Sequence, residues 1–126
     1  MPATKELTVK YVVLIFNNPA TWEALPEADR DRVMDAHNSG IRELRATGEL
    51  LRVDGLADPA AARTIRARKG VPVVTDGPFG ESKEYLAGVW ALDVDSLERA
   101  IEIATPLAEF DTVEVRQLMD LGGLEM

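Results

Sequence analysis

The sequence of residues 84–94, E-Y-L-A-G-V-W-A-L-D-V, predicts a long β-strand. Side chains along a strand point alternately to its two faces. One face here carries Leu86, Gly88, Trp90 and Leu92, and the other carries Tyr85, Ala87, Val89 and Ala91. Both faces are apolar and need burial, but a domain of this size provides only one layer of helices. We therefore expect a partner subunit to cover the second face.

The other expected strands lie on both sides of this one along the chain. Residues 9–16 read V-K-Y-V-V-L-I-F, which is typical of a central strand buried on both faces. Shorter strands are expected at residues 50–53, 64–68 and 113–118, with turn signals at Asp54-Gly55 and Lys69-Gly70. Residues 71–75 contain Pro72, which predicts an edge strand.

Two amphipathic helices complete the pattern. The first begins near Pro26 and ends near Gly48, and its packing face is formed by Val33, Met34, His37, Ile41 and Leu44. The second begins near Asp95 and is stopped by Pro106, with a packing stripe of Leu97, Ala100, Ile101 and Ala104. The order β-α-β-β-(β)-β-α-β predicts an α+β fold, the ferredoxin-like split β-α-β with an added hairpin. One domain is expected over residues 1–126, with residues 1–8 and 120–126 peripheral.

Composition excludes several kinds of function. The 126 residues contain no cysteine and one histidine, so disulfides and a cysteine nucleophile are impossible and a metal site is poorly supported. Twenty-two acidic against fourteen basic residues give a net charge of −8, which argues against nucleic-acid binding. No apolar run approaches the ~18 residues that span a membrane, and no cofactor fingerprint is present. We expect a soluble cytoplasmic protein without cofactor or metal.

Residues 75–84, T-D-G-P-F-G-E-S-K-E, closely resemble the signature of the DGPF-type branch of the YCII-related proteins. The similarity extends over most of the chain, including residues 11–15, the helix with His37, and residues 55–56, 93–97 and 113–116. The resemblance implies a dimeric α+β barrel of two ferredoxin-like subunits with their sheets face to face. The implied barrel is similar in plan to muconolactone isomerases and other small cofactor-free enzymes.

The resemblance also implies a catalytic His and Asp, and the matching positions here are His37 and Asp76. Many relatives of this branch are encoded beside sigma factors, which suggests a sigma factor as a partner. From the residues alone, His37 is either a core histidine bonded to one backbone group or a group that moves a proton in a cavity. Asp76 is either the head of a well-made turn or the carboxylate that orients His37.

Further candidate residues surround this turn. Gly77, Pro78 and Phe79 follow Asp76 and are expected at the rim of a substrate site, although Phe79 equally suits a dimer interface. Lys83 is a candidate for binding an anionic oxygen. Tyr11 on the first strand could reach the cavity, with core packing as the alternative.

Two functions from different classes are consistent with these residues. The first is a cofactor-free enzyme that acts on a small metabolite by acid–base chemistry of His37 and Asp76. The second is a non-catalytic ligand-binding or regulatory module associated with sigma-factor-linked transcription. Both predict a homodimer and a small-molecule ligand.

Overall fold

The apolar segment near the N-terminus forms β1 (Val9–Asn17), the central strand of the sheet. In the computed structural model, which describes residues 9–80 and 83–119, β1 lies between β5 (Tyr85–Val94) and β6 (Thr112–Gln117). β2 (Leu50–Gly55) pairs with the other edge of β5, and all three pairings are antiparallel. The strand order β2-β5-β1-β6 is that of a ferredoxin-like α+β fold, as predicted.

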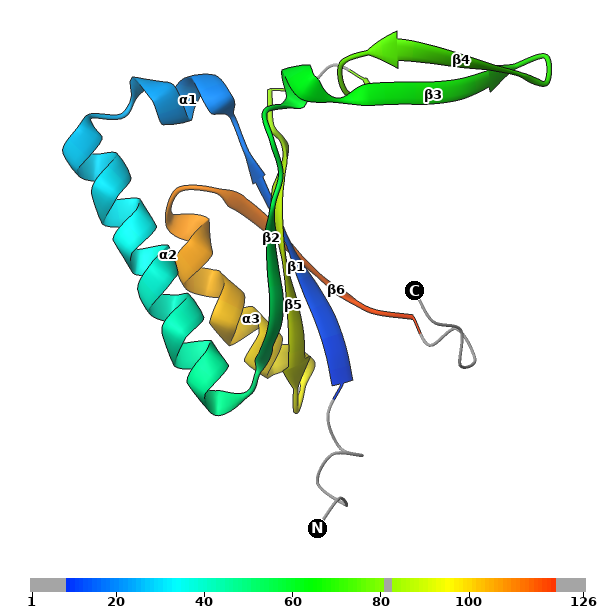
Figure 1. The fold of residues 1–126 in the computed structure, drawn as a ribbon. Coiled ribbons are helices and arrows are strands. Elements are labelled where there is room, and N and C mark those ends of the chain that lie inside the picture. Colours follow the sequence, from blue (N-terminus) through cyan, green and yellow to red (C-terminus); the bar gives the residue numbers. More distant parts are fainter. Residues whose placement is uncertain (1–8, 81–82, 120–126) are drawn as a thin grey trace.

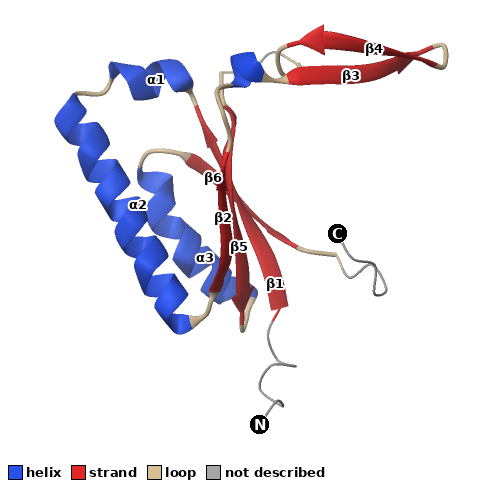
Figure 2. Ribbon diagram, viewed as in Figure 1, coloured by secondary structure: helices blue, strands red, loops and turns tan. Residues whose placement is uncertain are grey.

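Two helices cover one face of this sheet (Figures 1 and 2). The first, α2 (Glu27–Thr47), begins directly after Pro26 and carries Glu27 and Asp29 in its first turn. Those acids favour the positive end of the helix dipole, although no side chain caps the helix. It ends at Gly48, whose φ of 81° is a left-handed conformation that glycine adopts at little cost. Both ends agree with the sequence prediction.

A short helix, α1 (Pro19–Ala24), was not predicted. Its start is the Asn17-Asn18-Pro19 segment that breaks β1. The side-chain oxygen of Asn18 accepts the backbone N–H of Ala20, at 2.9 Å, and Pro19 takes the first helical position. The residues that end the strand therefore also start a helix. Trp22 in α1 packs edge-on against Phe110, with ring centroids 5.4 Å apart.

The core lies between the sheet and the helices. From β1 it contains Tyr11, Val13 and Ile15, and from β5 it contains Trp90, Leu92 and Val94, which confirms the predicted alternation of faces. The second long helix, α3 (Leu97–Ala104), begins after Ser96, whose hydroxyl oxygen accepts the backbone N–H of Arg99. It is followed by the 3-10 helix η3 (Thr105–Glu109).

The predicted packing stripe of α3 is partly wrong. Leu97 and Ile101 are exposed, whereas the buried residues are Ala100, Ile103, Ala104 and then Leu107 in η3. This set has the spacing i, i+3, i+4 and i+7, which is one continuous helical face. The sequence alone offered two overlapping apolar stripes, and contact with the sheet selects between them.

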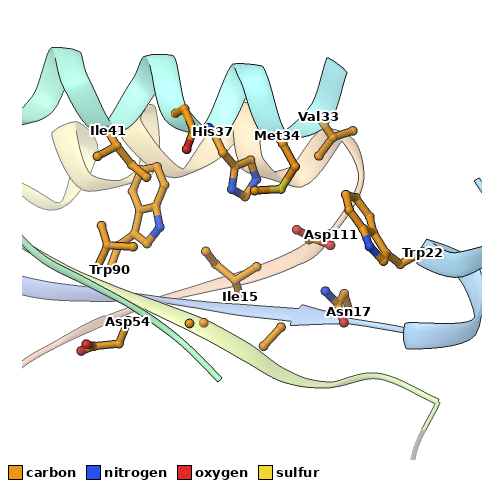
Figure 3. A pocket seen from close by; sticks show the side chains of 15 residues that line it. Ile15, Asn17, Trp22, Val33, Met34, His37, Ile41, Asp54, Trp90 and Asp111 are labelled. Carbon is orange, nitrogen blue, oxygen red and sulfur yellow. The ribbon is translucent and has the colours of Figure 1, made fainter. Parts of the chain in front are cut away.

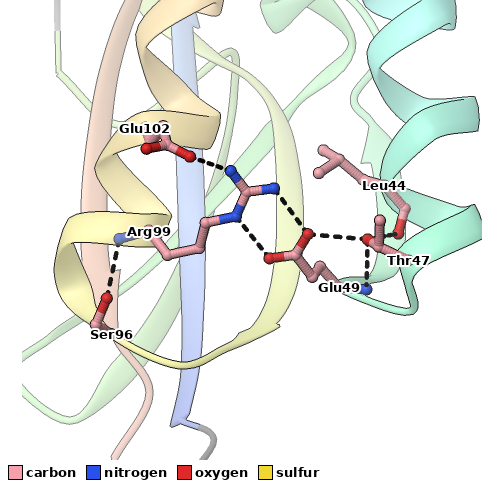
Figure 4. A network of polar contacts seen from close by, with 6 residues as sticks. All are labelled: Leu44, Thr47, Glu49, Ser96, Arg99 and Glu102. Carbon is pink, nitrogen blue, oxygen red and sulfur yellow. Dashed lines mark hydrogen bonds and ion pairs between the residues drawn. The ribbon is translucent and has the colours of Figure 1, made fainter.

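A paired network joins α3 to the start of β2 (Figure 4). The Arg99 guanidinium donates from Nε to Oε2 of Glu49 at 2.7 Å and from Nη2 to Oε1 at 2.8 Å. The Thr47 hydroxyl also donates to Glu49, and Arg99 has a second partner in Glu102. Two parallel bonds between planar groups fix the end of α2 and the start of α3 relative to each other.

The added hairpin is a separate two-stranded sheet of β3 (Arg63–Arg68) and β4 (Val71–Asp76). A 3-10 helix, η2 (Pro59–Ala61), precedes it. Lys69 and Gly70 have φ values of 50° and 79°, so both turn residues have the positive φ of a tight hairpin turn. Asp54 and Gly55 lie inside β2 and do not form the predicted turn. The hairpin projects beyond the sheet on the side away from the helices (Figure 1).

In the described part of the chain, the second face of the sheet carries no helix (Figure 2). Its centre is apolar: Val12 lies opposite Ala91, and Leu14 lies opposite Val89. On either side, an ion pair occupies the same face, Arg52–Asp54 on β2 and Glu114–Arg116 on β6. We call this surface the open sheet face. Among the described residues, no helix is long and apolar enough to cross a membrane.

Candidate functional site

A cavity of about 460 Å³ lies between α2 and the sheet (Figure 3). Its volume is within the range of small-molecule sites in proteins. Most of its wall is apolar, and its polar side chains are few. The lining residues are Ile15, Asn17, Trp22, Val33, Met34, His37, Asn38, Ile41, Val53, Asp54, Gly55, Ala87, Gly88, Trp90 and Asp111.

The cavity exists because α2 diverges from the sheet towards its N-terminal end (Figure 1). Within α2 only Leu44, near the other end, is buried, while Met34 remains 46% exposed. The stripe predicted to pack on the sheet therefore lines a cavity over most of its length. Gly88 in β5 also lines the cavity and has no side chain to fill it. A β-carbon at this position would lie 3.1 Å from the Asp54 carbonyl oxygen.

His37 projects from α2 into the cavity (Figure 3). Its ring lies edge-on to that of Trp90, with centroids 6.0 Å apart and planes inclined by 82°. Burial lowers the pKa of His37 below its usual 6.5, because the charged imidazolium loses solvent. At neutral pH the cavity therefore holds a neutral imidazole, which can accept a proton.

Asp111 is the second titratable group whose side chain enters the cavity (Figure 3). It lies between η3 and β6, next to Phe110, which packs on Trp22. Burial raises the pKa of the Asp111 carboxyl to about 6, and the negative charge of Glu84 adds to the rise. Its Oδ1 atom is buried and has no hydrogen-bond partner among the described residues.

Burial moves the pKa values of His37 and Asp111 closer to each other. Desolvation pushes the carboxyl up and the imidazole down, which are the directions expected when groups of opposite charge type are buried. Pairs with perturbed pKa values in a cavity are typical of functional sites. The fold brings together these two groups, from α2 and from the start of β6.

Asp76, the predicted partner of His37, does not line this cavity. It ends β4 on the hairpin, where its side chain is 90% exposed and forms an ion pair with Arg63, with 3.2 Å between Oδ1 and Nε. Within the described chain, Asp76 therefore lies where its first alternative expects it, at the head of a turn. Its pairing with His37 stays a prediction.

The turn after Asp76 is fixed to the hairpin base. Gly77 has a φ of 91°, its N–H donates to the Ala62 carbonyl at 2.8 Å, and its own carbonyl accepts the Thr64 hydroxyl at 2.8 Å. Phe79 is 75% exposed, with the Arg66 guanidinium 5.2 Å above its ring. This exposure suits the interface role that the sequence left open for Phe79.

Pro78 lines a hollow that shares residues with a hollow next to the cavity. Asn17, Trp22 and Ala87 line both the cavity and a second hollow of about 210 Å³. That hollow shares Tyr85, Leu86 and residues 56–59 with a third, which reaches Pro78. The predicted rim residue Pro78 therefore does not line the His37 cavity itself and lines the third of these hollows.

The remaining predicted site residues lie elsewhere. Lys83 lines a neighbouring hollow with Asn17, Asn18, Thr21, Glu84 and Phe110. Tyr11 is buried in the core, which is the alternative to a cavity position, and is not among the described residues that line the cavity. Among residues 9–80 and 83–119, no three His, Cys, Asp or Glu side chains are grouped so that they could hold a metal ion.

Sequence reasoning missed Asp111 and Trp22. Asp111 is separated from His37 by more than seventy positions and stands just before the strand expected at residues 113–118, in a segment that periodicity does not mark. Trp22 lies in the short helix that was not predicted. The one usable signal was Asn18-Pro19, a cap residue followed by proline, which is a helix-start pattern.

The fold and the cavity define the class of this protein: a ferredoxin-like α+β protein with a pocket between its longest helix and its sheet. The YCII-related domain matches residues 9–121, and the chain belongs to this family. An uncharacterized protein of Rhizobium meliloti (strain 1021) is similar, with 34% identity over 112 residues, which cover 86% of this chain and 90% of that protein.

Proposed function

We propose that this protein is a cofactor-free enzyme that binds a small metabolite in the α2 cavity and moves a proton on it. The observation that supports this most directly is the occurrence of His37 and Asp111 in one largely apolar cavity, with pKa values displaced towards each other. Groups with pKa values near the working pH are the most efficient general acids and bases.

In this proposal the neutral imidazole of His37 removes a proton from carbon or oxygen of the substrate and returns it at another position. The ring contact with Trp90 holds the imidazole in place. The Asp111 carboxylate lines the same cavity as His37 and positions the substrate through its unpartnered Oδ1 atom. The proton that leaves the substrate is given back, so no oxidant or second substrate is required.

The test is deuterium exchange, which detects proton abstraction without knowledge of the true substrate. Unsaturated γ-lactones and cyclic enones are incubated with the protein in D₂O, and loss of the proton beside the carbonyl is followed by NMR. We expect at least one compound to exchange about a hundredfold faster than in buffer. His37→Gln, if folded, should reduce this to the buffer rate.

Glu43→Gln provides a matched control, since Glu43 is exposed on α2 and is not among the residues that line the cavity. It should exchange like the wild type. Asp76→Asn tests the predicted pair separately: loss of exchange in this variant would support a role for Asp76 alongside His37. Equal exchange in wild type and His37→Gln would contradict the proposed base.

We also propose that the chain belongs to the DGPF-type branch and forms a homodimer through its open sheet face, as a dimeric α+β barrel. The apolar centre with Val12, Leu14, Val89 and Ala91, bordered by ion pairs on both outer strands, has the core-and-rim arrangement of protein interfaces. The projecting hairpin, with Phe79 exposed, is suited to reach a second subunit. In such a dimer, Asp76 would approach the partner rather than its own cavity.

Light scattering after gel filtration tests the dimer. The wild type should have twice the 13.8 kDa chain mass. Leu14→Lys places a charge at the centre of the open sheet face and should give the single-chain mass. Ile101→Lys is the control, because Ile101 is an exposed apolar residue on α3. A dimer that survives Leu14→Lys would exclude this face as the interface.

The alternative function, a ligand-binding or regulatory module linked to a sigma factor, would use the same cavity without chemistry. It predicts saturable binding of a small molecule with no deuterium exchange in any compound. It also predicts that a sigma factor encoded beside the gene is retained by the immobilised protein under reducing, low-salt conditions. Exchange that depends on His37 favours the enzyme.

A further inference from the structure

The cavity carries negative charge that no cation in its lining balances. Its ionisable side chains among the described residues are His37 from α2, Asp54 from β2 and Asp111 from the segment before β6, and no described Lys or Arg lines it. The Asp54 carboxylate points away from the cavity and pairs with Arg52 at 2.7 Å (Figure 3). Asp111 is therefore the charge that a ligand meets.

The charged groups around the cavity add to its negative charge or are paired outside it. Glu84 precedes β5, accepts the hydroxyl of Thr112 at 2.8 Å and acts on Asp111 through its negative charge. Lys83 lines the neighbouring hollow with Glu84 and does not line the cavity. Arg32 on α2 is exposed and paired with Glu109 at 2.8 Å, and Arg30 donates to the Glu23 carbonyl.

Oδ1 of Asp111 also lacks a donor. It is buried, and no described residue offers it a hydrogen bond. A buried carboxylate oxygen without a partner is costly, and such atoms are normally satisfied. A ligand N–H directed at Oδ1 would remove that cost and would gain a charge-assisted bond if the ligand is cationic.

The walls favour a flat ligand. Trp22 and Trp90 both line the cavity, at the two sides of His37 and Asp111 (Figure 3). Indole faces and edges pack well against aromatic rings, and they attract cations that lie over the ring. Aliphatic side chains, including those of Ile15, Val33 and Ile41, form other parts of the wall.

We infer that the cavity takes a compact aromatic molecule with a protonated amine, that Asp111 is the residue that binds this amine, and that the cavity discriminates against carboxylates. The inference rests on the proposed small-molecule site and names the chemical class of its ligand. It does not depend on catalysis, because selection by charge operates in binding alone.

The chain carries its own reporter for the test. It contains two tryptophans, and both line the cavity, so a ligand that enters should change the intrinsic fluorescence. The probes are benzylamine, benzyl alcohol and benzoate, which share a ring and differ in charge. At about pH 7.5 they are cationic, neutral and anionic.

We expect saturable binding of benzylamine with a dissociation constant about tenfold or more below that of benzoate. Asp111→Asn should bring the two constants within about threefold of each other, because the charge is lost while the shape is kept. Benzyl alcohol should bind both proteins similarly. Glu43→Gln is the matched control, since it removes one negative charge at an exposed site of α2 that does not line the cavity, and it should keep the preference.

The outcomes separate the inference from the proposal beneath it. Binding of benzoate equal to or tighter than that of benzylamine overturns the inference and leaves the small-molecule site standing. No saturable change with any of the three probes overturns the proposed site together with the inference. The preference of the wild type for benzylamine over benzoate tests the inference even if Asp111→Asn folds poorly.

Discussion

The imidazole of His37 lies edge-on to the indole of Trp90, with ring centroids 6.0 Å apart, so that helix α2 and strand β5 meet through two aromatic rings across a cavity. This contact fixes the orientation of the single histidine of the chain. It also withdraws the ring from solvent, which favours its neutral form. Both the acid–base and the ligand-binding proposals depend on this arrangement.

The first prediction concerns the pKa of His37. NMR titration of its ring protons should give a value below 6.5, because burial disfavours the charged form. The unfolded chain binds the proton more readily than the folded one. The contribution of His37 to stability is therefore intact above about pH 6.5 and is lost as the pH falls below that value. A measured pKa above 6.5 would show that a nearby carboxylate dominates over burial.

The second prediction concerns Asp111 and has the opposite sign. Its folded pKa of about 6 lies above its unfolded value of 3.8, so the folded state holds the proton more tightly. Ionisation of Asp111 therefore lowers stability as the pH rises from about 4 to about 6. Asp111→Asn should stabilise the protein by roughly 1 kcal/mol at neutral pH, after allowance for solvent at this half-buried site.

Denaturant unfolding of wild type and Asp111→Asn at two pH values measures this effect. The difference in unfolding free energy should be present at about pH 7.5 and nearly absent at about pH 3, where the carboxyl is largely protonated in both states. Glu43→Gln, at an exposed site of α2, is again the control and should show no such stabilisation. A destabilised Asp111→Asn at neutral pH would mean that Oδ1 has a structural partner.

The third prediction compares two residues of the α2 stripe. Leu44 is buried near the end of α2 that contacts the core, whereas Met34 borders the cavity and is 46% exposed. Leu44→Ala should lower the unfolding free energy by about 2 to 4 kcal/mol. Met34→Ala should cost less than about 1 kcal/mol, since it removes few packed neighbours. Equal losses would indicate that α2 closes onto the sheet in solution.

The fourth prediction concerns the Arg99–Glu49 pair (Figure 4). Hydrogen bonding to Arg99 lowers the pKa of Glu49 below its usual 4.5. Its contribution to stability is therefore present above about pH 4.5 and is lost as the pH falls below the depressed value. A double-mutant cycle of Glu49→Gln and Arg99→Gln should give a coupling of about 1 kcal/mol at neutral pH. Coupling that persists unchanged at about pH 2 would contradict a charge-based origin.

Much of the fold could be predicted from local pattern. The alternation in β5 identified the residues that face the helices, and the start and end of α2 followed from Pro26 and Gly48. The strand order followed from the sequence of elements, because the split β-α-β pattern allows few arrangements. The α3 stripe was wrong in part because two apolar stripes overlap there and only contact with the sheet distinguishes them.

The candidate site was predictable only for His37. Its position in the apolar stripe of α2 placed it towards the sheet, but periodicity cannot distinguish a packed stripe from one that lines a cavity. Whether space remains depends on the angle between α2 and the sheet and on the missing side chain at Gly88. These are properties of two distant segments together.

The sequence by itself determined the strands, the helices α2 and α3 and the inward direction of His37, because each depends on neighbours within a few residues. The tertiary structure alone decided which carboxylate shares the cavity with His37. Asp111 enters it from the start of β6, and Asp76 lies exposed on the hairpin. Burial, which displaces the pKa values of His37 and Asp111, arises only when segments far apart in the chain exclude water from the space between them.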